Sequence, residues 1–500
     1  MAYVEAPPAR RTTAIGVAAL GALSLAAGTL LGPRETLAGA AVFVFASLLA
    51  MRELATPTVT WPNAIAAFVL VMWLVPARGY RLPISLPFSL EPYRVVLAAL
   101  LVFLLVGVIN GRLKLEFLGF GVPLLILAGA AVVAAILNYQ ELANAFEGGG
   151  AFKSLSYFLG FLAVFVLVAS TIKTQAAMDT VVRALVVGAT IVAVSAIYES
   201  RSGYNAFDHL SEWIPALVSE ARVAFEQRGG NVRVYASAQH PIALSAALFM
   251  AFPLALYLVS RASTKPRSRL WVVAAAICAM GAVATISRTT VVMAVALGLV
   301  AIWVRGRQVV RFWPLLLILP IAIHFAVPGA LGGIYKALTF QSGGLAADAY
   351  ARPGEQGSGR LADFEPGLHV WGDSPLVGKG IGSQVTTKEA GVAQTAEGAQ
   401  GAVIIFDNEW LNTLVSLGVI GLAAVAWFVW GSLITVGRFA RRVRGPRSDL
   451  AAACAAAIGA FGIAMFVFDA FAFVQATILF FLIAALGLQA RRLGPRPADA

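Results

Sequence analysis

The sequence predicts an all-α, polytopic membrane protein with about 14 transmembrane helices, within a range of about 12–14. Of its 500 residues, 59% are hydrophobic and only 12% are charged, whereas an ordinary soluble domain carries roughly 25% charged residues. Apolar stretches long enough to cross a hydrocarbon core of roughly 30 Å recur along nearly the whole chain. These stretches are continuously apolar, while the strands of a membrane barrel alternate with period two, so a helical protein is expected.

The expected spans follow from the apolar stretches in order. Most are separated by short polar connections. The second, third and tenth spans are short enough that each could merge with a neighbouring span or re-enter the membrane without crossing it. The spans are 13–32, 37–52, 61–76, 95–110, 119–138, 155–172, 180–198, 241–260, 270–286, 290–304, 312–327, 410–437, 450–468 and 470–488.

The distribution of basic residues predicts the orientation. With both termini in the cytoplasm, the inner loops collect Lys and Arg, as the positive-inside rule requires. These residues include Arg261, Lys265, Arg267 and Arg269, then Arg305, Arg307 and Arg311, then Arg438, Arg441, Arg442, Arg444 and Arg447, and finally Arg491, Arg492 and Arg496. The formal net charge of +12 is therefore an orientation signal, and no nucleic-acid partner is expected.

Several chemistries are excluded by what the sequence contains. The chain has two cysteines, Cys278 and Cys454, both within apolar runs, which argues against a disulfide scaffold or a zinc finger. Its four histidines are scattered rather than placed at ligand spacing. P-loop, dinucleotide-binding and HExxH motifs do not occur. We therefore expect no metal and no cofactor.

Two predicted outer segments, about 199–240 and about 328–409, are too long to be simple connectors, and long ordered loops usually carry function. The second contains Leu361, Phe364, Leu368 and Trp371 at helical spacing. The chain is thus divided into N-terminal helices with the first long loop (1–230), central helices with outer arginines (231–327), one large extracytoplasmic loop containing short helices (328–409), and C-terminal helices with a cytoplasmic tail (410–500).

Three outward arginines are candidates for anion binding. Arg288 lies at the tip of a predicted outer hairpin, and Arg233 and Arg360 lie in the two long outer loops. Guanidinium groups match phosphate oxygens and stay charged at any working pH. The alternatives are an interfacial Arg288 whose head reaches water and solvated surface roles for Arg233 and Arg360.

Asp407 and Glu409 are two carboxylates at the start of the span that closes the large loop. Either can cap the helix or favour the positive end of its dipole. Either can also act as the general base that takes the proton of an attacking hydroxyl. His240, before Pro241, can cap its helix, pack or contact a ligand, and Asp469 is an acid in a very apolar setting whose partner the sequence does not identify.

Four segments, taken together in order, resemble the O-antigen ligase/polymerase superfamily of bacterial membrane glycosyltransferases. The segments are VRVYASAQHPIALSAALFMAFPLAL (232–256), SRTTVVMAVALGLV (287–300), GRLADFEPGLHVWGDSPLVGKGIG (359–382) and DNEWLNTLVSLGVIGL (407–422). The resemblance covers roughly residues 230–430 and implies a GT-C-like fold. It also implies metal-independent glycan transfer from polyprenyl diphosphate at the outer face of the membrane.

Residue by residue, the resemblance implies donor diphosphate binding by Arg233, Arg288 and Arg360. Asp407 stands where ligases usually show His in an HN-type motif, and this departure is more similar to a polymerase. Further substrate contacts are expected within the matched segments at His240, Asn408 and Trp371.

The leading hypothesis is an inverting polymerase of undecaprenyl-type, polyprenyl-diphosphate-linked repeat units in the bacterial plasma membrane. The close alternative is an O-antigen-type ligase that moves a glycan to another lipid, a wall polymer or a protein. A transporter or flippase is the alternative from another class, although it would be expected to show repeated halves and unwound, Gly/Pro-broken paired helices near the midplane. Expected partners are the lipid-linked donor, the glycan acceptor and the bilayer, and a polymerase could also work with a chain-length regulator.

Overall fold

The computed structural model describes residues 60–84, 89–145, 150–220, 227–228, 231–306, 363–383, 385–386, 403–404 and 406–493. The predicted spans at 13–32, 37–52 and 312–327 lie outside these ranges, as does Arg360. Every other predicted span coincides with a helix, so the all-α, polytopic membrane fold is confirmed for the described part of the chain.

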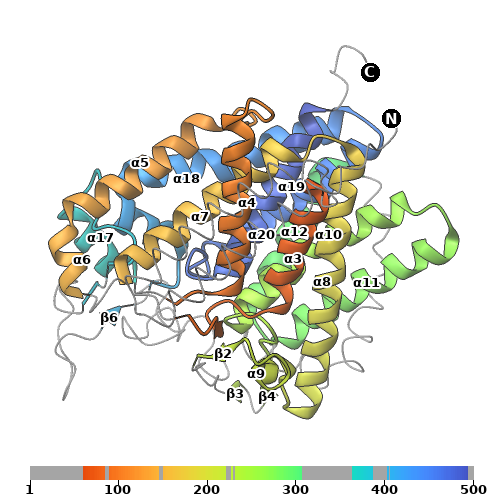
Figure 1. The fold of residues 1–500 in the computed structure, drawn as a ribbon, viewed down its shortest axis with the longest axis horizontal. Helices are drawn as coiled ribbons and strands as arrows, with labels where there is room; N and C mark the ends of the chain where they lie inside the picture. Colours follow the sequence, from red (N-terminus) through yellow and green to blue (C-terminus); the bar gives the residue numbers. More distant parts are fainter. Residues whose placement is uncertain are drawn as a thin grey trace, which may run out of the picture.

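Nine helices in the described residues are long and apolar enough to cross a membrane. They are labelled in Figure 1: α4 (Pro92–Ile109), α7 (Gly150–Thr171), α8 (Gln175–Ser202), α10 (Pro241–Arg261), α11 (Lys265–Ala284), α12 (Arg288–Arg305), α18 (Glu409–Arg442), α19 (Pro446–Ala464) and α20 (Val474–Arg492). Two further apolar helices, α3 (Trp61–Leu74) and α5 (Gly121–Leu137), are shorter. The small helices are α6 (Tyr139–Ala145), the 3₁₀ turn η1 (Ala206–His209), α9 (Leu210–Trp213) and α17 (Phe364–Gly372).

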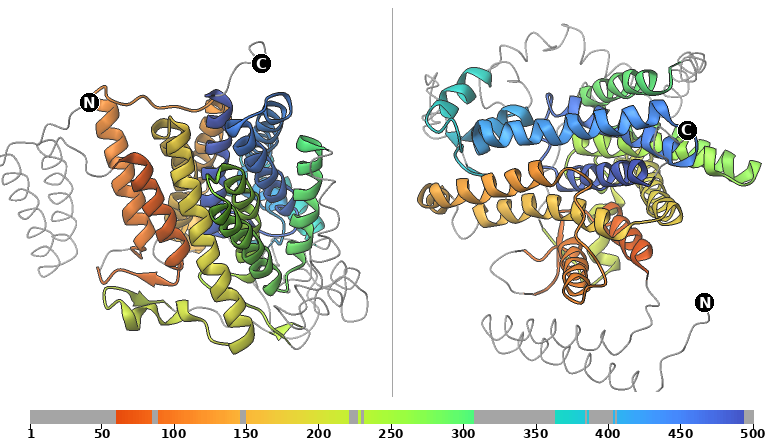
Figure 2. Two further views of the ribbon diagram at one scale, coloured as in Figure 1. Left: turned by 90° about the vertical axis from the view of Figure 1, so that its right-hand side faces the viewer. Right: turned by 90° about the horizontal axis from the view of Figure 1, so that it is seen from above.

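Burial separates a central helix from a lipid-facing ring. In α20, 94% of the membrane-length window is buried, against 22% in α4, and α20 lies in the middle of the bundle in Figure 2. The outer helices expose large apolar side chains, among them Leu105, Ile191, Leu270 and Leu299. In a membrane protein such side chains face lipid, because lipid tails are as apolar as they are.

Strand structure in the described residues is limited to three antiparallel two-residue pairs. These are β1 (Tyr80–Arg81) with β2 (Val218–Ser219), β3 (Gln227–Arg228) with β4 (Asn231–Val232), and β5 (Val385–Thr386) with β6 (Val403–Ile404). The first pair joins the α3–α4 connection to the long segment after α8. The hydroxyl of Tyr80 strengthens this joint by donating to the Phe207 carbonyl at 2.8 Å and accepting from the Leu210 N–H at 3.1 Å.

A basic end of the bundle is fixed by contacts between helix termini. Arg261, at the end of α10, pairs with Asp179 near the start of α8. Arg305, at the end of α12, donates to the Ala440 carbonyl in α18 at 2.7 Å and to the Asp449 carboxylate in α19 at 2.7 Å. Two of the inner-loop arginines that predicted the orientation, Arg261 and Arg305, therefore lie at the same end of the bundle.

The opposite end joins the other termini of the same helices. The Glu409 N–H, at the start of α18, donates to the Met465 carbonyl just after α19 at 2.8 Å. The Val474 N–H, at the start of α20, donates to the Gln239 side chain just before α10 at 2.7 Å. The functional candidates within the described residues belong to this second end.

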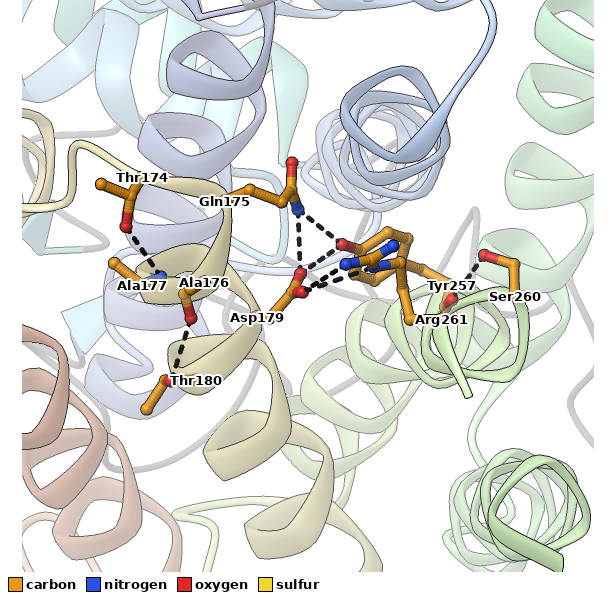
Figure 3. A network of polar contacts seen from close by, with 9 residues as sticks. All are labelled: Thr174, Gln175, Ala176, Ala177, Asp179, Thr180, Tyr257, Ser260 and Arg261. Carbon is orange, nitrogen blue, oxygen red and sulfur yellow. Dashed lines mark hydrogen bonds and ion pairs between the residues drawn. The ribbon is translucent and has the colours of Figure 1, made fainter. Parts of the chain in front are cut away.

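A polar network at the basic end fastens α8 to α10 (Figure 3). The Asp179 carboxylate, 3% exposed, accepts from the Tyr257 hydroxyl and from two guanidinium nitrogens of Arg261 at 3.1 and 3.3 Å. Gln175 donates to both Asp179 and Tyr257, at 2.9 and 2.8 Å. One buried carboxylate thus serves three donors from two helices.

Asp179→Ala is expected to lower the free energy of unfolding by about 1–3 kcal/mol, because it leaves the buried Tyr257 hydroxyl without its acceptor. The partial exposure of Arg261 limits the loss, since water can solvate its guanidinium. The measurement is the thermal unfolding midpoint of the detergent-purified protein. The control is Arg267→Ala in the exposed first turn of α11, and equal midpoints for the two variants would contradict this role.

Candidate functional site

A pocket of about 230 Å³ opens at the end opposite the basic end. Its walls come from segments far apart in the sequence: the α3–α4 connection, α7, the turn after α17, the first part of α18 and the α19–α20 connection. Its charged lining residues, within the described part of the chain, are Arg78, Glu409 and Asp469.

Glu409 is the first residue of α18 and is only 1% exposed. Asn408 caps the helix by accepting from the Leu411 N–H at 3.2 Å, which leaves the Glu409 side chain available for other contacts. Its carboxylate accepts from the Thr413 hydroxyl at 2.8 Å and from the Phe471 N–H at 2.7 Å. The carboxylate is therefore held in one orientation at the pocket wall.

Asp469 supplies a second carboxyl at the same place. It lies in the α19–α20 connection, accepts from the Asn412 side chain at 3.0 Å and contacts the Glu409 carboxyl directly. Burial raises the pKa of Asp469, and the hydrogen bonds and the nearby Arg78 guanidinium oppose this shift. Two carboxyls in direct contact share one proton, because ionising both side by side is costly. The structure thus supplies the partner of Asp469 that the sequence did not identify.

Arg78 faces this carboxyl pair from the α3–α4 connection. Its φ of 58° is in the left-handed region, which is uncommon for a residue other than glycine. The conformation is held by its N–H, which donates to the buried Glu91 carboxylate at 2.9 Å. The guanidinium lies 4.8 Å from the centre of the Tyr157 ring. Backbone strain of this kind clusters at functional sites.

Glu91 and Tyr157 form the support beneath Arg78. Glu91 is fully buried at the N-terminus of α4 and accepts from the Tyr157 hydroxyl. The guanidinium of Arg94, in α4, lies 3.9 Å from the centre of the same ring, which belongs to α7. Because Tyr157 also lines the pocket, this arrangement ties the position of Arg78 to the pocket wall.

The pocket also borders a break in α18. Gly418 has φ 64° and ψ −169°, outside the helical region. The turn after α17 enters this break: Lys379 and Gly380 donate their N–H groups to the carbonyls of Val415 and Ser416, both at 2.9 Å. In return, the Val419 N–H donates to the Pro375 carbonyl at 2.9 Å. Backbone that leaves the helix at membrane depth needs such partners or a cavity to line.

The two predicted catalytic carboxylates are placed differently. Glu409 lines the pocket, whereas Asp407 is outside the described lining. Asp407 is partly buried, and its N–H donates to the buried Asp363 carboxylate at 3.3 Å. Asn408, predicted to contact substrate, is 3% exposed and caps α18.

Two of the predicted diphosphate-binding arginines, Arg233 and Arg288, lie at the pocket end without being among the described lining residues, and Arg360 lies outside the described part of the chain. Arg288 begins α12, whose other terminus carries Arg305 at the basic end. It is only 8% exposed, which argues against the interfacial alternative. Arg233 is partly buried. Two residues later, the Tyr235 N–H donates to the Glu199 side chain near the end of α8, which places this segment at the same end.

The two other predicted substrate contacts take part in local structure. His240 caps α10 by accepting from the Ile242 N–H at 3.1 Å, and its ring lies 5.5 Å from that of Phe473. Trp371 belongs to α17, which confirms the helix expected in the large loop, and its indole N–H donates to the Pro375 carbonyl at 3.0 Å.

Sequence reasoning did not identify Arg78, Glu91, Asn412 or Tyr157. A signal did exist for Arg78: an arginine in a short polar connection between two apolar stretches of the predicted outer side. Among the described residues, no group of three or more His, Cys, Asp or Glu side chains could hold a metal ion.

Residues 273–426 match the family model described as O-antigen ligase. The match includes the C-terminal part of α11, all of α12 and α17, and the first half of α18, and it confirms the resemblance to the O-antigen ligase/polymerase superfamily. No curated protein matches the chain significantly. The described helices make the chain a multi-pass membrane protein, and the match over residues 273–426 supports a membrane glycan-transfer function of the ligase/polymerase type.

Proposed function

We propose that the chain is a GT-C-type membrane glycosyltransferase that polymerises polyprenyl-diphosphate-linked oligosaccharides at the outer face of the bacterial plasma membrane. One observation carries this proposal: a buried, oriented carboxylate, Glu409, lines a pocket at the end of the bundle opposite the basic residues. Under the positive-inside rule the basic end is cytoplasmic, which makes the pocket extracytoplasmic.

In the proposed reaction, a hydroxyl oxygen of the acceptor sugar attacks the anomeric carbon of the donor. The new C–O bond forms as the bond to the diphosphate breaks, and polyprenyl diphosphate leaves with the electron pair. The Glu409–Asp469 pair holds one shared proton at rest. Glu409 takes the hydroxyl proton as general base while the shared proton moves fully to Asp469, so both carboxyls are protonated after the transfer. Attack from the face opposite the leaving group inverts the anomeric configuration.

The diphosphate is a good leaving group, so charge stabilisation replaces a strong general acid. We assign this role to Arg233, Arg288 and Arg360, since guanidinium groups bind phosphate oxygens in a bidentate manner. Arg288 carries the most weight because its burial strengthens its interaction with an anion. Neither a metal ion nor a cofactor is part of this scheme.

A ligase reaction is the second candidate, and the match to an O-antigen ligase family model favours it. The carboxylate at Asp407, where ligases usually show His, favours polymerisation instead. Both reactions use the same donor and differ in the acceptor, which for a ligase is another lipid, a wall polymer or a protein.

The discriminating experiment supplies the purified protein, reconstituted in lipid vesicles, with a polyprenyl-diphosphate oligosaccharide and separates the products on a gel. A ladder of products is expected for a polymerase. A single addition to a second acceptor would identify a ligase, and lipid-linked glycan moved across the bilayer without any covalent product would indicate a transporter and overturn the proposal.

A further inference from the structure

The pocket has the mixed lining that a sugar ring requires. Hydroxyl and amide groups come from Ser154, Ser383, Asn412 and Ser416. Aromatic rings come from Tyr157, Phe158, Phe161, Phe406 and Phe471. A sugar presents hydroxyl groups around its edge and an apolar C–H face, so both kinds of lining have a counterpart on one small molecule. A lipid tail would leave the polar groups unsatisfied.

The size of the pocket limits the occupant. Its volume of about 230 Å³ is below the roughly 300–1,000 Å³ of sites that enclose drug-sized ligands. We therefore expect one sugar ring in the pocket, with the rest of any glycan outside it.

The charges of the lining favour a neutral sugar. The described lining contains one cation, Arg78, against the two carboxyls of Glu409 and Asp469. An acidic sugar would bring a third carboxyl beside this pair, and like charges in one site disfavour each other. Neutral hydroxyls can instead donate to the carboxyls and accept from the guanidinium.

Arg78 is built to present donors to such a ligand. Two hydrogen bonds fix its backbone. The Arg78 N–H donates to the Glu91 carboxylate, and the Glu220 N–H donates to the carbonyl of the neighbouring Gly79 at 2.9 Å. Within the described part of the chain, its guanidinium makes no ion pair or side-chain hydrogen bond and rests on the Tyr157 ring. Its N–H donors therefore remain available to a molecule in the pocket.

We propose that this pocket is the subsite for a neutral sugar residue of the acceptor glycan, bound between Arg78 and the Glu409–Asp469 pair. The assignment to the acceptor rests on the proposed function, because the general base must touch the attacking hydroxyl. The arginines assigned to the donor diphosphate are not among the described lining residues. Residues from the N-terminal part of the chain, outside the matched range 273–426, then help to select the acceptor.

The test measures sugar binding directly, by saturation-transfer-difference NMR on the full-length protein in lipid nanodiscs. The probes are glucose, galactose, mannose and N-acetylglucosamine, with glucuronate as the acidic comparison. At least one neutral sugar is expected to give a signal that falls fivefold or more in Arg78→Asn. Asn removes the charge and tolerates the left-handed backbone. Ser154→Phe, which fills the pocket, should have the same effect.

Arg81→Ala is the matched control, since this partly exposed arginine is in the same connection and outside the pocket lining. It should bind sugar like the wild type. The proposal is overturned if no neutral sugar binds, if glucuronate binds best, or if Arg78→Asn and Ser154→Phe both bind like the wild type.

An acceptor titration shows whether the sugar that binds in the pocket belongs to the acceptor or to the donor. In the polymerisation assay, Arg78→Asn should raise the KM for the acceptor about tenfold and leave the donor KM unchanged; the opposite split would assign the pocket to the donor sugar and overturn the proposal. Sugar binding without any turnover would refute the proposed function alone. A product ladder without Arg78-dependent sugar binding would refute this subsite alone.

Discussion

Glu409→Gln is expected to lower kcat by about 10²–10⁴-fold, the usual contribution of a general base. The amide can keep the local hydrogen bonds, with its oxygen accepting from the Phe471 N–H and its NH₂ group donating to the Thr413 hydroxyl, at the positions where the carboxylate now accepts from both. The substitution therefore removes the base and preserves the shape of the pocket. The measurement is the rate of product formation at saturating donor and acceptor.

Asp407→Asn is the matched comparison, because it makes the same chemical change two residues away. Asn keeps the shape of the side chain, and the backbone N–H that donates to Asp363 is unchanged. We expect a much smaller loss of kcat. If Asp407→Asn abolished turnover and Glu409→Gln kept it, the base would be Asp407 and the role of the pocket in catalysis would be lost.

The helices could be predicted because each one carries its own signal. A run of about 20 apolar residues identifies a membrane-length helix wherever it occurs. The sequence spans did not use capping residues, and the structure shows that these set the helix starts: Thr174 caps α8 and Ser287 caps α12, each accepting from a backbone N–H of the first turn. The positions of Lys and Arg also predicted which helix termini lie at the same end. This signal is local as well, because it depends only on the composition of short loops.

The site was only partly predictable, because its charged residues come from distant segments. The position of Glu409 at the mouth of a span was visible in the sequence, whereas its contact with Asp469 depends on how α19 packs against α18. Arg78 precedes Glu409 by more than 300 positions. Nothing in the local pattern links these residues, and only the packed bundle brings them to one pocket.

The break in α18 shows a second limit of local reasoning. The stretch around Gly418 is apolar and reads as uninterrupted helix, and glycines are frequent in membrane helices. The helix is broken by another segment, because the turn after α17 supplies the hydrogen-bond partners that the broken turn needs.

Gly378→Ala is expected to separate this turn from α18, with a loss of about 3–5 kcal/mol, which is at the upper end for a single substitution. Gly378 has φ +73°, and an added Cβ would lie 2.4 Å from the Ser416 carbonyl carbon and 2.5 Å from the Leu417 nitrogen. Neither atom is in a flexible side chain, so the two backbones must move apart. The hydrogen bonds from Lys379 and Gly380 to α18 would then be lost.

Hydrogen exchange reports this separation directly. The amide of Val419, which donates to the Pro375 carbonyl, should lose its protection in Gly378→Ala while amides in the middle of α20 keep theirs. Activity should fall with it, because Val415, Ser416 and Leu417 line the pocket together with Gly382 and Ser383 from the displaced turn. Gly372→Ala is the control, since a Cβ there meets nothing within 4 Å. Continued protection of Val419 in Gly378→Ala would contradict this prediction. It would mean that α18 keeps its shape at the pocket wall without the contact from the turn after α17.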